Sequence, residues 1–327
     1  MKNCSWVLLR FFVLCLAPIF LFAEWGFPQE DITQYPSRPI TFIMPSVAGS
    51  ESDLACRLIS KEAEKFLGRP IVVVNKPGGS FTVGLAAVAS SKPDGYTVGY
   101  TAHSGLFLVP YMDKVPYHPV KDITQIMQFG YVNLAVVVKS DSPFKKFEDI
   151  VTYARKNPKK ATYGSTGVGT IGALAMEEIA KREGVEFTHI PFKGSPETQT
   201  ALLGGHVLFG AGSLSYSLLE SGQIRLLLLI AENRSPGFPN TPILKDLGYE
   251  IPAPLFINVA GPKGIPDEIV RKLEGAYTKA MGEPAFIKGM KELHVTVIHR
   301  NSKELSDYVS YNYEVYGKLL KEMGLSK

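Results

Sequence analysis

Cysteine is scarce in this sequence, and the positions of the few cysteines exclude a fold held together by disulfides. The 327 residues contain three, Cys4, Cys15 and Cys56. The first two fall in an N-terminal segment that we predict to be removed, so Cys56 has no partner left in its own chain. Cys56 follows Leu54 and Ala55 in a helix-like pattern, and we interpret it as a small buried apolar residue.

A surplus of charge of one sign is also missing. Lys and Arg number 35 and Asp and Glu number 31, which gives a formal net charge of +4 at pH 7. No run of basic residues forms a stripe for nucleic acid or for a membrane surface. Lys156, Lys159 and Lys160 lie close together, but they flank a proline at a predicted helix end and fit a solvated face. We therefore expect no nucleic-acid partner.

Long apolar runs occur only near the N-terminus. Lys2 and Arg10 precede an apolar stretch at residues 13–22, and the small Ala23 follows it. This order is typical of a secretory signal, so we predict that residues 1–23 are cleaved near Ala23 and that the protein is exported. Lipidation at Cys15 is the alternative, and the bulky leucine before it disfavours that modification. No later stretch is long and apolar enough to span a membrane.

Familiar catalytic motifs are absent as well. The sequence contains no H-E-x-x-H and no P-loop lysine motif, and Ser165 does not stand in a G-x-S-x-G elbow. The six histidines show no metal-ligand spacing. We therefore predict no catalytic residue, no metal and no cofactor. An exported hydrolase that uses Ser165 or His103 is the alternative.

Two short motif matches have simpler explanations. Residues 167–172 fit G-x-G-x-x-G, but the next predicted strand, residues 187–191, does not end in the acidic residue that a dinucleotide site needs. Residues 142–145 fit S-x-x-K, but Ser142 stands where a helix N-cap belongs.

The rest of the sequence alternates strand and helix patterns. Short apolar runs end in loops rich in Gly, Pro or Ser, and helix-period patterns follow them. This alternation predicts an α/β fold with parallel strands. The predicted strands are residues 40–44, 71–74, 96–101, 134–138, 187–191, 207–211, 224–230, 256–260 and 295–298, and the predicted helices are residues 53–66, 83–90, 147–156, 171–183, 196–203, 267–281, 284–293 and 302–323.

Two loops, residues 45–53 and 164–170, repeat the same chemistry. Each follows a predicted strand, is rich in Gly and hydroxyl side chains, and leads into a helix. The first N–H groups of a helix carry partial positive charge, Gly lets the backbone approach a ligand, and Ser and Thr can donate to its oxygens. Ligands of open α/β sheets bind outside the carboxyl ends of the strands. We therefore predict that the loops hold a carboxylate from both sides of a cleft; turn formation and helix capping alone are the alternative.

Eight segments resemble the extracytoplasmic solute receptors of tripartite tricarboxylate transporters, the TctC/Bug type. They occur in the family's order from residue 35 onward. The segments are Tyr35-Pro36-Ser37-Arg38-Pro39-Ile40, residues 45–53, Asn75-Lys76-Pro77-Gly78-Gly79, Pro93-Asp94-Gly95-Tyr96-Thr97, residues 164–170, Pro191-Phe192-Lys193-Gly194-Ser195, Leu203-Gly204-Gly205-His206-Val207 and Ala260-Gly261-Pro262-Lys263-Gly264-Ile265-Pro266.

The resemblance implies a two-lobed periplasmic-binding-protein fold, in which each lobe is a mostly parallel sheet flanked by helices. It implies that residues 35–130 and 250–327 form lobe 1, that residues 131–249 form lobe 2, and that the ligand binds in the cleft between them. It also implies a periplasmic, non-enzymatic receptor that delivers a small organic carboxylate to a membrane permease of one large and one small subunit. A receptor that reports a carboxylate to a signalling partner is the alternative with the same pocket.

The expected ligand-binding residues come from the two loops, from the end of a strand in each lobe and from the segment after residue 191. They are Ser46, Val47, Ala48, Gly49, Ser50, Ser52, Asp53, His103, Ser165, Thr166, Gly167, Gly169, Thr170, Phe192, Lys193, Gly194 and Ala211.

The sequence departs from the family pattern at four places. Ser50 stands where a second glycine is usual, and Phe192 stands where tyrosine is common. Ile171-Gly172 replaces a pair of the Ser-His type, and residues 210–212 lack a frequent aspartate. The exchanges at Ile171-Gly172 and Phe192 remove polar groups, so we expect a more apolar pocket. The missing aspartate could have held an amine, so its absence favours an uncharged or purely anionic ligand with an apolar body.

Overall fold

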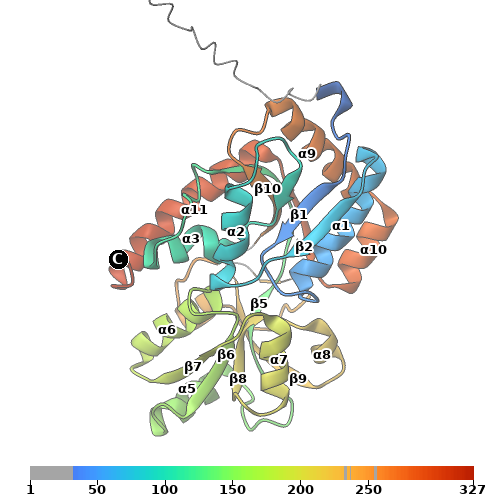
Figure 1. Cartoon of the computed structure of the whole chain (residues 1–327). Coiled ribbons are helices and arrows are strands. Elements are labelled where there is room, and N and C mark those ends of the chain that lie inside the picture. The colour runs from blue at the N-terminus through green and yellow to red at the C-terminus, as the bar shows by residue number, and fades with distance from the viewer. Residues whose placement is uncertain (1–31, 232–233, 236, 254–255) are drawn as a thin grey trace, which may run out of the picture.

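The computed structural model describes residues 32–231, 234–235, 237–253 and 256–327. The predicted signal peptide, residues 1–23, lies outside them. Figure 1 shows two lobes, one above the other, and each lobe is built on its own sheet with helices packed around it. The predicted two-lobed α/β class is therefore confirmed.

The first sheet has six strands in the order β11-β4-β10-β3-β1-β2. Its strands are β1 (Ile40–Met44), β2 (Ile71–Asn75), β3 (Thr97–Gly99), β4 (Ile123–Tyr131), β10 (Ile257–Pro262) and β11 (Thr296–Arg300). The helices of this lobe are η1 (Ile32–Gln34), α1 (Glu51–Leu67), η2 (Gly79–Phe81), α2 (Thr82–Ala89), α3 (His103–Phe107), α4 (Val109–Met112), α9 (Asp267–Met281), α10 (Pro284–Glu292) and α11 (Ser302–Glu322).

The second sheet has five strands in the order β7-β6-β8-β5-β9. Its strands are β5 (Leu134–Lys139), β6 (Ala161–Ser165), β7 (Phe187–Pro191), β8 (Phe209–Ser213) and β9 (Ile224–Ile230). Its helices are α5 (Phe147–Lys156), α6 (Ile171–Glu183), α7 (Ser195–Leu203), α8 (Tyr216–Glu220) and η3 (Leu244–Leu247). The chain enters this sheet between β4 and β5 and leaves it between β9 and β10. The predicted boundaries at residues 130/131 and 249/250 stay a prediction.

The expectation that each sheet is mostly parallel is wrong, because both sheets are mixed. Strand β1 pairs in parallel with β2 and β3, and β6 pairs in parallel with β7 and β8. The strands that carry the chain into and out of the second lobe run in opposite directions. For this reason β4 pairs antiparallel with β10, and β5 pairs antiparallel with β9.

Helices α1 and α6 begin directly after the two predicted loops, and hydroxyl side chains cap both of them. The Ser50 hydroxyl accepts from the N–H of Asp53, and the Thr170 hydroxyl accepts from the N–H of Ala173. Such caps satisfy one N–H of the first turn and fix the direction in which the helix starts. Glycines in the left-handed conformation end both helices.

Large aromatic side chains fill the interior of both lobes. Phe42, Tyr277 and Phe286 are fully buried around the first sheet. A second apolar cluster continues from α3 and α11 of the upper lobe into the lower lobe, and in it Phe107 stacks on Tyr316 with 5.8 Å between ring centroids. The two sheets are therefore joined by apolar packing as well as by the chain.

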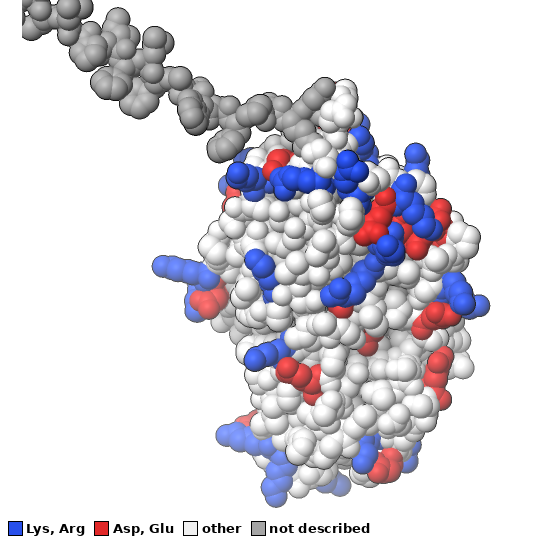
Figure 2. Space-filling view, turned by 45° about the vertical axis from the view of Figure 1, so that its right-hand side comes forward, with Lys and Arg blue, Asp and Glu red and all other residues white. Residues whose placement is uncertain are grey.

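Positive and negative side chains alternate on the face of the molecule shown in Figure 2, and neither sign forms a broad patch there. Many of these charges are paired, for example Lys61 with Glu64 and Lys65 with both Glu62 and Glu283. Among the described residues, no helix combines the length and the apolar character needed to cross a bilayer.

A buried polar network ties the centre of the first sheet to the segment that leads toward α3. The Asn258 side chain accepts from the N–H of Thr101 at 3.0 Å and donates to the Thr101 hydroxyl at 2.7 Å and to Gln125 at 2.6 Å. Asn258 is fully buried. A buried network of this kind stabilises the fold only while every member keeps its partner.

Gly172 allows α6 to start directly against β8. A Cβ atom at Gly172 would lie 2.3 Å from the carbonyl oxygen of Ala211, which is a backbone atom and cannot rotate away. We expect Gly172→Ala to lower the free energy of unfolding by about 1–3 kcal/mol, because the helix must shift away from the strand. Urea unfolding monitored by circular dichroism measures this change.

Gly275 provides the matched control, because it lies within α9 and a Cβ atom there would contact nothing within 4 Å. Gly275→Ala should raise the free energy of unfolding by about 0.5–1 kcal/mol through helix propensity. Equal effects of the two substitutions would contradict the steric role assigned to Gly172.

Candidate functional site

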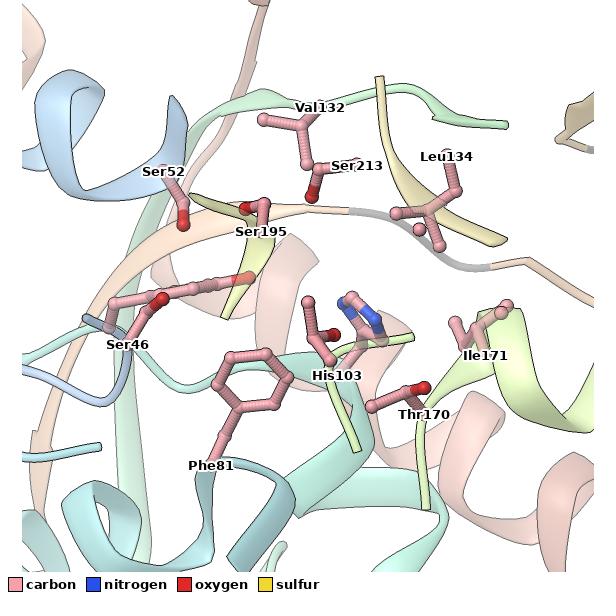
Figure 3. Close-up of a pocket in the computed structure, with 14 residues that line it drawn as sticks. Ser46, Ser52, Phe81, His103, Val132, Leu134, Thr170, Ile171, Ser195 and Ser213 are labelled. Atoms are coloured by element: carbon pink, nitrogen blue, oxygen red, sulfur yellow. The ribbon is translucent and has the colours of Figure 1, made fainter. Parts of the chain in front are cut away.

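A cavity lies between the lobes where the ends of β1 and β3 face the starts of α6 and α7 (Figure 3). It is small, with a volume of about 30 Å³. That space suits a molecule of a few non-hydrogen atoms, not a drug-sized one. The residues that line it are Ser46, Ser52, Phe81, Tyr100, His103, Val132, Leu134, Thr166, Thr170, Ile171, Gly172, Ser195, Gly212 and Ser213.

None of these lining residues is Lys, Arg, Asp or Glu. The polar groups that face the cavity are hydroxyls, one imidazole and backbone amides. Ser52, Gly172 and Ser195 lie in the first turns of α1, α6 and α7, where N–H groups have no partner within the helix. Three helix starts that meet at one cavity create a positive potential without a fixed cation, which is suited to an anionic group.

The first loop is held by charged groups that lie outside the cavity. The Asp53 carboxylate accepts from the N–H of Gly49 at 3.0 Å, from Arg57 at 2.9 Å and from Asn75 at 2.8 Å. Only 1% of Asp53 is exposed, and the backbone of Gly49 has a φ of 83°. The carboxylate therefore shapes the loop from behind, and the Ser46 and Ser52 side chains reach the cavity.

The second loop is held in a comparable way by His189. Its Nε2 lies 2.7 Å from the hydroxyl oxygen of Ser165, and that hydroxyl donates to the carbonyl of Gly167 at 2.9 Å. The imidazole stacks on Tyr163 at 4.6 Å, and its partial burial lowers its pKa. Ser165 is fully buried and does not line the cavity, so its hydroxyl positions the loop and is not presented to a ligand.

Direct contacts between the two lobes close the cavity. The N–H of Gly169 donates to the Ser80 hydroxyl at 3.3 Å, and Val47 packs so closely on Gly194 that a Cβ atom at Gly194 would lie 2.3 Å from it. Farther along the interface His294 stacks on Tyr216 at 4.2 Å. These contacts hold the two lobes together around the cavity.

Glu51, the first residue of α1, makes the polar contact nearest to the cavity. Its carboxylate accepts from the Ser195 hydroxyl and from the Gln199 amide of α7, both at 3.3 Å. Burial raises the pKa of the Glu51 carboxyl above its ordinary value of 4.5, and hydrogen bonds from its own backbone, Gln199 and Ser195 offset part of that rise.

His103 is the one imidazole that lines the cavity. Only 7% of the residue is exposed, and Phe81 lies beside it with 6.5 Å between ring centroids. No described residue gives either ring nitrogen a hydrogen bond. Burial lowers the pKa of His103 to about 4, so the ring is neutral at pH 7.

The cavity brings together five of the residues predicted from the sequence, which are Ser46, Ser52, His103, Thr166 and Thr170. The other predicted residues lie in the same loops or next to a lining residue without lining the cavity themselves: Val47, Ala48, Gly49, Ser50, Asp53, Ser165, Gly167, Gly169, Phe192, Lys193, Gly194 and Ala211. Contact of any of them with a ligand stays a prediction.

The following nine lining residues are not among the expected ligand-binding residues: Phe81, Tyr100, Val132, Leu134, Ile171, Gly172, Ser195, Gly212 and Ser213. Three of them, Ile171, Gly172 and Gly212, belong to the places where the sequence departs from the family pattern. Some carried a usable signal. Ser195 is the first residue of a helix that follows a Gly-containing loop, and Thr170 lies one residue before such a helix. Ser213 is the last residue of a strand. No group of three potential metal ligands occurs among the described residues.

Comparison with known proteins gives consistent matches over most of the chain. Residues 55–325 match the tripartite tricarboxylate transporter family receptor. A Cupriavidus necator protein, "UPF0065 protein in gbd 5'region", is 35% identical over 300 residues, which cover 91% of each chain.

Two solved structures share the fold. The periplasmic binding protein BugD is 27% identical with a TM-score of 0.82, over 90% of this chain and 100% of its own. An R. palustris protein solved with adipate is 26% identical with a TM-score of 0.81, over 89% of this chain and 99% of its own. These similarities confirm the predicted periplasmic-binding-protein fold.

The buried carboxyl of Glu51 predicts a pH dependence of stability. Because its pKa is raised in the folded protein, its contribution to the free energy of unfolding is fully present below pH 4.5 and is lost as pH rises through the raised pKa. Glu51→Gln has no charge to bury. The variant should therefore gain stability over the wild type as pH rises from about 4 to about 8, as measured by urea unfolding at each pH.

Glu268→Gln is the matched control, because Glu268 is exposed in the first turn of α9. A gain in stability with pH that both variants share would not come from the lobe contact. Parallel pH profiles for the wild type and Glu51→Gln would show that the Glu51 carboxyl is not desolvated at the lobe contact.

Proposed function

Because the chain belongs to the tripartite tricarboxylate transporter receptor family, we propose that it captures a small organic carboxylate between its lobes and delivers it to a membrane permease. The family is one of solute-binding receptors and not of enzymes. The observation that carries the proposal is the cavity into which both lobes direct hydroxyl groups and helix starts.

The chemistry of the cavity supports an anionic ligand. Ser52 and Thr166 approach from opposite lobes, and neither is committed to a short hydrogen bond with its own loop. The starts of α1, α6 and α7 add amide groups with partial positive charge. A related receptor is solved with adipate, a carboxylate. A carboxylate that bridges both lobes would make the closed arrangement the favoured one.

The periplasm is the compartment that fits this role. The matched structure of BugD is that of a periplasmic binding protein, and the predicted signal at residues 1–23 would export the chain. The permease would consist of one large and one small membrane subunit, which the closed receptor would recognise.

A carboxylate-sensing receptor that docks on a signalling partner would use the same cavity and differ only in the outer surface that the partner contacts. The hydrolase alternative finds no support, because the Ser165 hydroxyl is fully buried and donates to the carbonyl of Gly167.

A thermal-shift screen with mono-, di- and tricarboxylates, aromatic ones included, tests the proposal. The protein is first unfolded in urea and refolded, so that any ligand carried through purification is removed. At a hundredfold excess over Kd a ligand stabilises the folded state by about 2.7 kcal/mol, which raises Tm by several degrees. The proposal fails if no carboxylate raises Tm.

Single-residue variants test whether a carboxylate that raises Tm binds in the cavity. Ser52→Ala and Thr166→Val should each weaken binding of the best carboxylate about tenfold, because each removes one hydrogen bond to a charged group. Ser90→Ala is the control, since Ser90 is exposed at the end of α2. Equal affinities of all three variants would place the ligand elsewhere on the protein.

A further inference from the structure

The buried imidazole of His103 is a polar group that the fold itself does not satisfy. More than nine-tenths of the residue is buried, it lines the cavity, and no described residue gives its ring nitrogens a hydrogen bond. Figure 3 shows the ring in the middle of the lining residues, above Phe81. A buried polar group without a partner costs about 1–3 kcal/mol. A ligand atom that pairs with the ring would recover that cost.

Apart from the Thr170 hydroxyl, the labelled side chains on the far side of the cavity from Ser46, Ser52 and Ser195 are apolar. In Figure 3 Ser46, Ser52 and Ser195 lie on one side of His103, and Leu134 and Ile171 lie on the other. Leu134 opens β5, and Ile171 is the first residue of α6. Thr170, which precedes Ile171, also lines the cavity, but its hydroxyl donates to the carbonyl of Gly167 and accepts from the N–H of Ala173. Gly172 and Gly212 bring no side chain.

The lining holds no fixed positive charge for a second carboxylate. A ligand with one anionic group can place it among the serine hydroxyls and helix starts. A second carboxylate would then face the side chains of Leu134 and Ile171, with the partial charge of the first turn of α6 but no cation beside it. A buried charge that is not paired is strongly disfavoured. The imidazole of His103 cannot replace that cation at pH 7, because it is neutral there.

From these three observations we infer that the preferred ligand is a small monocarboxylate with one uncharged hydrogen-bonding group, a hydroxyl or a carbonyl, that pairs with His103. The rest of the ligand is apolar and packs against Leu134 and Ile171. This inference rests on the proposed function and narrows it. His103 is then the specificity-determining residue, because it distinguishes this ligand from an unsubstituted acid of the same length.

Isothermal titration calorimetry at pH 7.5 tests the inference with acids of one chain length. The ligands are butanoate, its 2-, 3- and 4-hydroxy and 3-oxo derivatives, succinate and malate. We expect at least one hydroxy or oxo monocarboxylate to bind tenfold or more tightly than both butanoate and succinate. Tighter binding of succinate or malate would overturn the inference and leave the proposed function standing. Binding of none of these acids, and of none in the thermal-shift screen, would instead count against the function itself.

Variants of His103 separate recognition from a purely structural role. His103→Leu should reduce the preference for the substituted acid over butanoate to less than threefold, while butanoate binding changes little. His103→Gln should retain part of the preference, because its amide can still form a hydrogen bond. His206→Leu is the control, since His206 is exposed and lies away from the cavity. A preference that survives in His103→Leu would overturn the inference.

The apolar side of the cavity gives a second, independent test. Ile171→Arg places a cation where a second carboxylate would lie, so succinate binding should strengthen at least tenfold relative to butanoate. An unchanged ratio in a folded variant would show that Ile171 does not set the charge of the ligand.

Discussion

The close approach of two loop–helix junctions, one from each sheet, is the constraint on which the rest of the structure depends. Glu51 of α1 meets Ser195 of α7, and Gly169 before α6 meets Ser80 of the first lobe. Only in this arrangement do three helix starts face one cavity, so that their partial charges add at the same place. Neither half of the cavity is complete alone, so a molecule that fills it contacts both lobes.

Charged residues support this site and neutral ones line it. Asp53 and Arg57 form an ion pair behind the first loop, and His189 holds Ser165 behind the second. A lysine in the cavity would have to lose its hydration whenever the lobes closed without a ligand, which is costly. Burying hydroxyl and amide groups costs less free energy than burying a lysine ammonium group, and their orientations stay the same. The inferred preference for a ligand with one carboxylate follows from this arrangement.

The sequence predicted the parts of the fold that depend on local pattern. The run at residues 40–44, the loop after it and the helix that follows agree with β1 and α1. Strand β4 was missed, because Gln125 and Gln128 interrupt its apolar pattern. Both glutamines are buried, and their side-chain oxygens accept from partners distant in sequence: Asn258 donates to Gln125, and Arg300 donates to Gln128. A strand with buried glutamines does not show the alternating apolar pattern by which strands are predicted. Because β4 was missed, its antiparallel pairing with β10 was not predicted either.

The sequence identified the two loops of the site, but not the residues Val132 and Leu134 that line the cavity with them. Ser52 and Thr170 could be found because each lies at a helix start after a Gly-containing loop. Leu134 and Val132 lie where the chain passes from one sheet to the other, and they reach the cavity only because β4 and β5 point across it. Their role depends on how the lobes are placed, which local pattern does not encode. The part of the apolar side formed by Val132 and Leu134 is thus a property of the folded chain, whereas the part formed by Ile171 follows from the departure of residues 171–172 from the family pattern.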